Sequence, residues 1–321
     1  MRIQYTPMEF EDSFFLAEDR DGFHITSMMK RVWAVELEIV NVVSEICKRH
    51  GIKWFAVCGT LLGAVREKGY IPWDDDIDLG MLRVDYERFV RFAREELPEG
   101  WNLHNFRDDM HPNASTLNIF NTEELHTDRE FLELYHGCPY GVGIDIFPFD
   151  NLPEDPEEEN IFHLLATLAY DCFIESENGV LYDDCSDDVK ERVTELENNV
   201  GLMFDRSIPI RPQAHKYADQ IATMYYDSPA TEVSIIAFYT SNINNRKSRP
   251  AFDSVVMMPF ENIMIPVPAD YDTILRQTFG PNYMIPVKGG SDHEYPNYAG
   301  EERILRKQYE DQGLEFPEVF Q

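Results

Sequence analysis

Four aspartates stand within five positions of the sequence, Asp74, Asp75, Asp76 and Asp78. If residues 76–79 lie on a strand, Asp76 and Asp78 project from one face, while the apolar residues next to them point to the core. Two neighbouring carboxylates repel each other unless a cation lies between them, and oxygen-only ligands suit Mg²⁺ or Mn²⁺. The spacing therefore predicts a divalent-metal site with Asp76 and Asp78 as ligands and Asp74 as an outer or occasional ligand.

A glycine and a threonine precede this cluster, at the end of an apolar run. The sequence predicts a strand over about 53–58 and a helix over about 61–68, with Gly59 and Thr60 at the junction. The first turn of a helix has free N–H groups and the positive end of the helix dipole, which bind phosphate. Gly59 lets a ligand approach the backbone closely, and Thr60 can cap the helix or hold a phosphate oxygen. We therefore expect a phosphate site that faces the metal site.

Two other interpretations of the aspartate cluster are open. A solvated turn would also be rich in acids, although such turns do not usually alternate acids with isoleucine and leucine. A calcium loop is the second, because Asp74, Asp76, Asp78 and Asp85 have the spacing of EF-hand positions one, three, five and twelve. Against it, Leu79 stands where the loop needs glycine, and Asp85 replaces the usual glutamate.

Two stretches around these residues resemble the LicD family. Residues 59–66 read GTLLGAVR and residues 69–78 read GYIPWDDDID. The resemblance implies a nucleotidyltransferase-like fold, in a superfamily that includes bacterial phosphocholine transferases and fukutin-type ribitol-phosphate transferases. It extends over the preceding helix and, more loosely, over the part of the chain from residue 259 onward.

A further acid, Asp145, lies within the apolar segment 140–150, which reads YGVGIDIFPFD. An unpaired carboxylate that points into a sheet core is costly, so Asp145 is expected to face a cation or a reacting group. A nucleotidyltransferase-type site needs a third acid on the strand next to the first pair, and the LicD family has a matching IDIFP segment. We therefore predict Asp76, Asp78 and Asp145 as the catalytic acids, and Asp150 as a turn residue.

Several basic residues are candidates for binding a phosphorylated donor. Arg66 and Lys68 lie between the predicted phosphate loop and the acids, although either can be a surface charge. Arg246 and Lys247 belong to a basic cluster at 246–249, which can equally be an exposed turn. His293 stands at a histidine that the LicD pattern leads one to expect, and is a possible contact to substrate or metal.

Composition limits the classes of function. The chain has 321 residues and is 43% hydrophobic, so it can form a large core. Its 28 Lys and Arg against 59 Asp and Glu give a net charge of −31, which opposes extended binding to nucleic acid. Five cysteines without a C-x-x-C pair are typical of reduced cytosolic thiols and disfavour zinc. With no apolar stretch of 18 residues, we expect a cytoplasmic protein with at most peripheral contact to the inner face of a membrane.

The predicted elements indicate an α/β (α+β) fold: a nucleotidyltransferase-like mixed β-sheet flanked by helices, with an added helical subdomain. An amphipathic helix is predicted over 27–50, and a helix over 85–96 with Asp85 equally its cap or a ligand. Strands are predicted within 101–121 and 140–150, and another over 233–239. We divide the chain into an irregular lead-in (1–25), a catalytic core (26–153), a helical insertion (154–230) and a C-terminal part that completes the domain (231–321).

The three acids and the helix terminus specify a metal-dependent phosphoryl-transfer site. The LicD resemblance adds the substrates. It implies that a CDP-activated alcohol, such as CDP-choline, passes its substituted phosphate to a hydroxyl of a cell-surface glycan or glycolipid precursor and releases CMP. Two alternatives are a nucleotidyltransferase that moves NMP from an NTP to a small molecule, and a catalytically silent binding protein of the same fold.

Overall fold

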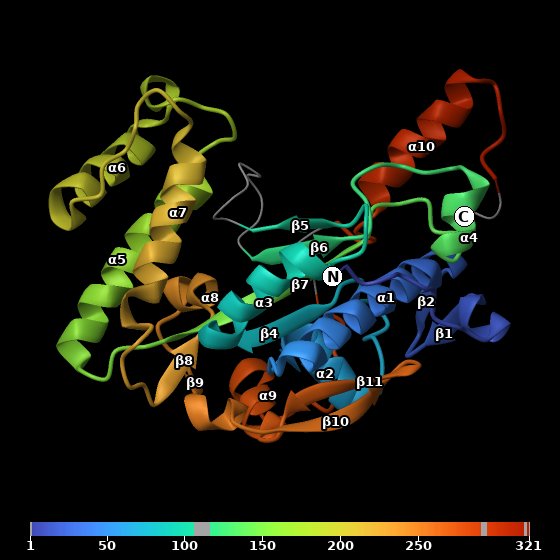
Figure 1. Cartoon of the computed structure of the whole chain (residues 1–321), viewed down its shortest axis with the longest axis horizontal. Coiled ribbons are helices and arrows are strands. Elements are labelled where there is room, and N and C mark those ends of the chain that lie inside the picture. Colours follow the sequence, from blue (N-terminus) through green and yellow to red (C-terminus); the bar gives the residue numbers. More distant parts are fainter. Residues whose placement is uncertain (1, 106–115, 290–293, 318–319, 321) are drawn as a thin grey trace.

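A computed structural model describes residues 2–105, 116–289, 294–317 and 320 (Figure 1). A mixed β-sheet lies at its centre, with helices around it. The strands of this sheet are β3 (Phe55–Ala56), β4 (Asp78–Leu82), β5 (Asn102–His104), β6 (Leu117–Phe120), β7 (Gly143–Asn151), β8 (Glu232–Ser234) and β9 (Lys247–Ser248). The predicted α+β class with a mixed sheet is confirmed.

The strand order is β3-β4-β7-β6-β5, and β8 and β9 extend from the far end of β7. Strands β4 and β7 are parallel, and the other pairs in this sheet are antiparallel. The register of the parallel pair sets Asp78 opposite Asp145. Two acids far apart in the sequence thus become neighbours at the start of adjacent strands.

Helix α1 (Ser27–His50) has the predicted bounds. It begins at Thr26, whose side chain accepts a hydrogen bond from the N–H of Met29, and ends at Gly51, whose φ of 60° suits glycine. Most of α1 is buried, and it packs with α3 (Arg83–Glu96) beside β7. Helix α3 starts two residues before the predicted position and Leu82 is its cap residue, so Asp85 lies in the first turn and is not the cap.

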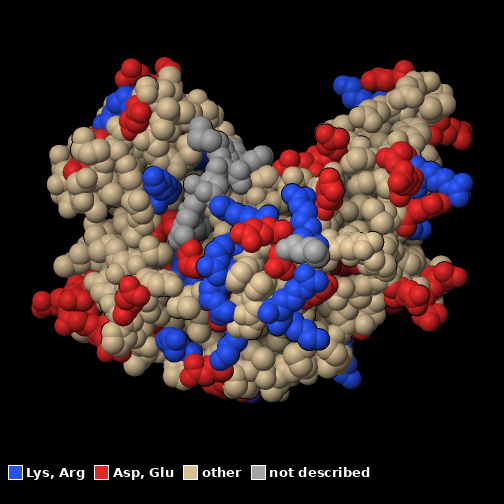
Figure 2. Space-filling model, viewed as in Figure 1, with Lys and Arg blue, Asp and Glu red and all other residues tan. Residues whose placement is uncertain are grey.

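The charge is spread unevenly over the surface. Although the net charge is −31, Figure 2 shows Lys and Arg side chains gathered near the middle of one face, over α1 and α3. Acidic side chains dominate the margins of this view. The described residues contain no helix that combines the length and the apolar character needed to cross a membrane.

A second cluster of buried side chains lies among four helices, separate from the core around the sheet. These helices are α5 (Pro156–Glu175), α6 (Asp187–Val200), α7 (Ile210–Ala222) and α8 (Ile236–Ser241), and α5 to α7 project at the left of Figure 1. Arg83 joins this group to the sheet, because it donates to Asp150 of β7 and to Asp219 of α7. Asp150 is therefore a buried ion-pair partner, and its interpretation as a turn residue was wrong.

The C-terminal part contributes hairpin β10 (Val255–Phe260) and β11 (Ile263–Pro268), followed by α9 (Tyr271–Phe279) and α10 (Ala299–Asp311). Hairpin β10–β11 packs against α2 (Cys58–Arg66). Near the N-terminus, β1 (Glu18–Arg20) and β2 (Phe23–Ile25) form a short hairpin, and α4 (Arg129–Leu134) precedes β7. Residues 2–25, expected to be irregular, thus include a short hairpin.

Three predicted elements differ from the structure near the site. Strand β3 has only two residues and α2 begins at Cys58, because the chain turns sharply there with a φ of 48°. Strand β4 begins at Asp78, so Asp76 belongs to the preceding loop. The strand predicted over 233–239 is wrong beyond Ser234, since Ile236–Ser241 is helical. A short buried apolar run has no periodicity that separates strand from helix.

Candidate active site

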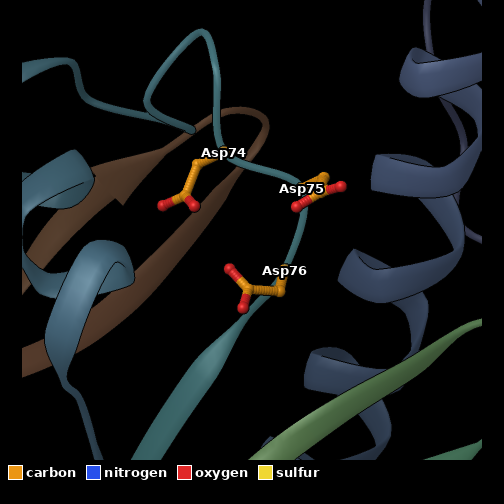
Figure 3. A group of neighbouring side chains, drawn as sticks. All are labelled: Asp74, Asp75 and Asp76. Carbon is orange, nitrogen blue, oxygen red and sulfur yellow. The ribbon is translucent and has the colours of Figure 1, made fainter. Parts of the chain in front are cut away.

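The loop before β4 brings three carboxylates together. One oxygen from each of Asp74, Asp75 and Asp76 lies within 4.8 Å of the others. Figure 3 shows the Asp74 and Asp76 carboxylates turned toward the same space, while Asp75 extends away from it. Because the loop is irregular, these side chains converge through the path of the backbone and not through the alternation of a strand.

Asp78 and Asp145 complete the acidic group from the two parallel strands. Asn118 of β6 lies opposite Asp145 in the antiparallel register, and its side-chain amide donates a hydrogen bond to the Asp145 carboxylate. The N–H of Asp145 bonds to the carbonyl oxygen of Ile77 at 3.0 Å. Asp145 is therefore held by β6 on one side and by the residue before β4 on the other. The sequence did not reveal the contact with Asn118.

The start of α2 lies directly against the acids. A Cβ placed on Gly59 would come within 2.3 Å of Oδ2 of Asp74, so only glycine leaves room for this carboxylate in its present position. Thr60 is buried inside α2, and its hydroxyl oxygen accepts a hydrogen bond from the N–H of Asp78 at 2.8 Å. The expectation that Thr60 caps the helix was wrong. It ties the helix to the first residue of β4.

The electrostatics of Asp74 and Asp78 favour a bound cation. The pKa of Asp74 is raised to about 8 by burial first, and then by the charges of Asp76 and Asp75. The pKa of Asp78 is raised well above its ordinary value by burial and by Asp76, Asp145 and Asp74, although the Cys58 thiol donates to its carboxylate. Within the described ranges, no Lys or Arg forms an ion pair with Asp74 or Asp78.

Asp75 has a different role from its neighbours. It is 1% exposed, and its Oδ2 accepts a hydrogen bond of 2.6 Å from the N–H of Asn297. The side-chain amide of Asn297 donates to the carbonyl oxygen of Asp75 at 2.5 Å. A segment 222 positions away thus fixes the carboxylate loop, and no local sequence signal could have shown this contact.

The predicted donor-binding cations are dispersed. Arg66 is 7% exposed at its side chain, pairs with Glu67, and donates to the carbonyl oxygen of Tyr283. Lys68 has an exposed side chain and a φ of 62°.

Two further cations follow β8. Arg246 forms ion pairs with Glu159 and Glu232, so it supports the helical group. Lys247 is buried and lines a pocket together with Cys58. His293 lies outside the described residues.

An opening at the start of β7 reaches the acids. Its walls include Asp76, Asp145, Phe120, Asn297 and Tyr298. The two carboxylates therefore face a space that a substrate can enter. Together with the fully oxygen-based donor set, this arrangement suits a hard divalent cation and a phosphate-bearing ligand.

Comparison with known proteins identifies the segment that carries this site. Residues 51–160 match the family described as LicD/FKTN/FKRP, nucleotidyltransferase domain. The chain is 34% identical over 122 residues to the lipopolysaccharide cholinephosphotransferase LicD of Haemophilus influenzae, which covers 38% of this chain and 44% of that protein. The matched segment includes α2, the carboxylate loop, β4 and β7.

Two uncharacterized Rickettsia proteins are also similar. The protein from Rickettsia typhi is 35% identical over 66 residues, or 21% of each chain. The protein from Rickettsia prowazekii is 42% identical over 48 residues, which is 15% of this chain and 18% of that one. The matches thus span less than half the length of each relative.

Proposed function

Residues 51–160 carry a domain of the LicD family, and from this premise we propose that the protein is a metal-dependent phosphotransferase. It transfers a phospho-alcohol, of the phosphocholine type, from a CDP-alcohol to a hydroxyl of a cell-surface glycan precursor such as a lipopolysaccharide, teichoic acid or capsule. The family resemblance supports a transferase, and the reaction, the donor, the acceptor and the metal are the proposed parts.

One observation supports the proposal most strongly. Asp78 and Asp145 are register partners on neighbouring parallel strands, and Asp74 lies against Gly59 at the start of α2. Carboxylates at this density and with raised pKa values are costly without a cation. Asp74, Asp76, Asp78 and Asp145 are therefore the proposed ligands of Mg²⁺ or Mn²⁺.

When bound, the metal would neutralise phosphate charge and polarise the phosphorus that is attacked. The chain's own residues position the reactants. Asn118 and Thr60 hold Asp145 and the start of β4 in place, and Gly59 at the start of α2 lies against the Asp74 carboxylate. In the transfer, the glycan hydroxyl oxygen forms a bond to the phosphorus that bears the alcohol, the bond from this phosphorus to CMP breaks, and the hydroxyl proton is released.

The proposal is tested by donor turnover. The purified chain is incubated with CDP-choline, CDP-ribitol or CDP-glycerol, a glycan acceptor and Mg²⁺, and CMP is measured. We expect metal-dependent CMP release that requires the acceptor, and loss of release in EDTA. Failure of every CDP-alcohol and acceptor pair would contradict the proposal.

A nucleotidyltransferase that acts on an NTP is the main alternative, since the matching family is described by a nucleotidyltransferase domain. The products separate the two reactions. Pyrophosphate released from an NTP would favour the alternative, whereas CMP released from a CDP-alcohol favours the phosphotransferase.

A further inference from the structure

A pocket lies beside the acids, on the side of Cys58, and its lining is largely apolar. Four phenylalanines contribute to its walls: Phe149, Phe238, Phe252 and Phe279. Phe238 and Phe279 keep 38% and 44% of their surface exposed, which is unusual for such large apolar side chains. Exposed aromatic rings around a concave site are typical of ligand binding.

The pocket and the acidic site lie along the same strand, β7. Asp145 and Phe149 lie on the same face of β7, since alternate residues of a strand share a face, and four residues span about 13 Å. A Cβ placed on Gly80 of β4 would come within 2.6 Å of Phe55 and Val57 and 2.9 Å of Phe149, so glycine leaves room for these side chains against β4. Cys58 lines the pocket and also donates to the Asp78 carboxylate. A ligand that spans this distance past Cys58 would reach from the acids to the pocket.

Two polar groups in the pocket lack hydrogen-bond partners in the part of the chain that the structure describes. Lys247 is 9% exposed, and neither its ammonium nor the side-chain amide of Asn245 has a hydrogen bond to any described residue. Ser234 and Thr278 also line the pocket, but their hydroxyls donate to the carbonyl oxygens of Asn245 and Ile274. The pocket thus offers aromatic surface together with one cationic donor and one amide.

The aromatic rings, the ammonium and the amide together favour some classes of ligand over others. A quaternary ammonium such as choline suits aromatic rings but is repelled by the Lys247 ammonium. An acyl chain would bury Lys247 and Asn245 without hydrogen bonds, which is costly. A planar heterocycle can stack on phenylalanine, while its carbonyl oxygen and ring nitrogen atoms pair with Lys247 and Asn245.

We propose that this pocket binds the pyrimidine base of the nucleotide donor. The assignment rests on the proposed function, and it places the base at the Cys58 side and the phosphates at the acids. The leaving and attacking oxygens lie roughly in line in phosphoryl transfer. The acceptor hydroxyl therefore enters from the opening formed by Asp76, Asp145 and Asn297.

The test measures cytidine and CMP binding by calorimetry in EDTA, so that the metal does not contribute. Thr278→Trp fills the pocket from the exposed surface of α9, and Lys247→Met removes the ammonium at similar volume. We expect each change to weaken cytidine binding about ten-fold or more. Lys216→Met, at an exposed lysine of α7, is the matched control and should leave the affinity unchanged.

Several results would overturn the assignment. The first is that neither variant changes the affinity for cytidine. The second is that the wild-type protein binds CMP but does not bind cytidine. The third is that the protein binds choline and Thr278→Trp abolishes this binding. Turnover separates this inference from the proposed function. Unchanged KM for CDP-choline in Thr278→Trp rejects the base pocket and keeps the transferase, whereas cytidine binding without any transfer keeps the pocket and rejects the reaction.

Discussion

Two enclosed carboxylates in the same sheet, Asp78 of β4 and Asp150 of β7, have opposite surroundings. Arg83 donates to both oxygens of Asp150, from Nε at 2.6 Å and from Nη2 at 2.7 Å. Burial raises the pKa of Asp150, and Arg83 opposes that shift. Asp78 instead has three carboxylates around it, and they raise its pKa further.

The difference separates a structural charge from a functional one. The Arg83 network is satisfied within the protein, and a buried pair of this kind is costly to break. The charge at Asp78 has no such partner among the described residues, and a divalent cation would supply it. The four predictions that follow test this contrast, from the largest expected effect to the smallest.

Asp78→Asn should lower the transfer rate on the order of 10³-fold or more, because it removes a metal ligand. The same change should not lower the thermal stability, since it relieves repulsion among the acids. Initial rates of CMP release and thermal unfolding measure the two effects. Asp227→Asn, at an exposed position, is the matched control. A large loss of stability with unchanged activity per folded molecule would reverse the assignment.

Arg83→Met should show the opposite pattern. It leaves Asp150 and Asp219 buried without their arginine, and we expect a loss of about 3–5 kcal/mol in the free energy of unfolding. Urea denaturation measures this loss. Arg276→Met breaks an exposed pair with Asp272 and should cost less than about 1 kcal/mol. Equal losses of stability in the two variants would show that the buried Arg83 network contributes no more than the exposed pair.

Mg²⁺ should stabilise the wild-type protein, because it binds the folded carboxylate site. At a concentration about 100 times its Kd, the expected gain is about 2.7 kcal/mol, and EDTA should remove it. Thermal unfolding with and without the ion measures the gain. In Asp78→Asn the gain should shrink, whereas in Arg83→Met it should persist. A wild-type protein that is indifferent to both Mg²⁺ and Mn²⁺ would exclude the metal site.

Gly59→Ala should change the stability of the fold least, and its main effect should be weaker metal binding. The new Cβ displaces the Asp74 carboxylate, whose end can move, while alanine favours the helix by up to about 1 kcal/mol. We expect unchanged or slightly higher stability and a metal affinity about ten-fold lower. Calorimetric titration with Mn²⁺ measures the affinity. Gly300→Ala in α10, where a Cβ makes only an ordinary contact with Arg303 at 3.8 Å, is the control.

Local sequence patterns predicted the elements that carry the site. The bounds of α1 followed from Thr26 and Gly51, and the apolar segment around Asp145 predicted β7. The placement of Asp145 next to the first acids also agrees with the register of β4 and β7. The roles of these acids as ligands stay predictions. The resemblance to LicD is confirmed over residues 51–160.

The remaining features depend on contacts that a linear pattern does not encode. Asp76 lies in a loop because the chain enters β4 only at Asp78, and its convergence with Asp74 is set by the path of that loop. Arg246 was grouped with Lys247 as a donor contact, but its partners are acids of the helical group and of β8. Arg246 lies just before β9 and Lys247 is the first residue of β9, and of the two only Lys247 lines the pocket beside Cys58.

Because Asn297 donates a hydrogen bond to Asp75, residues 51–160, which match the family, do not contain every contact that holds the acids in place. A polypeptide reduced to residues 51–160 would keep all five aspartates of the acidic group and lose the N–H that holds Asp75. It would also lose α1, against which this part of the sheet is packed. Transplanting the signature into another scaffold would therefore carry over the ligand atoms without the tether that sets their spacing.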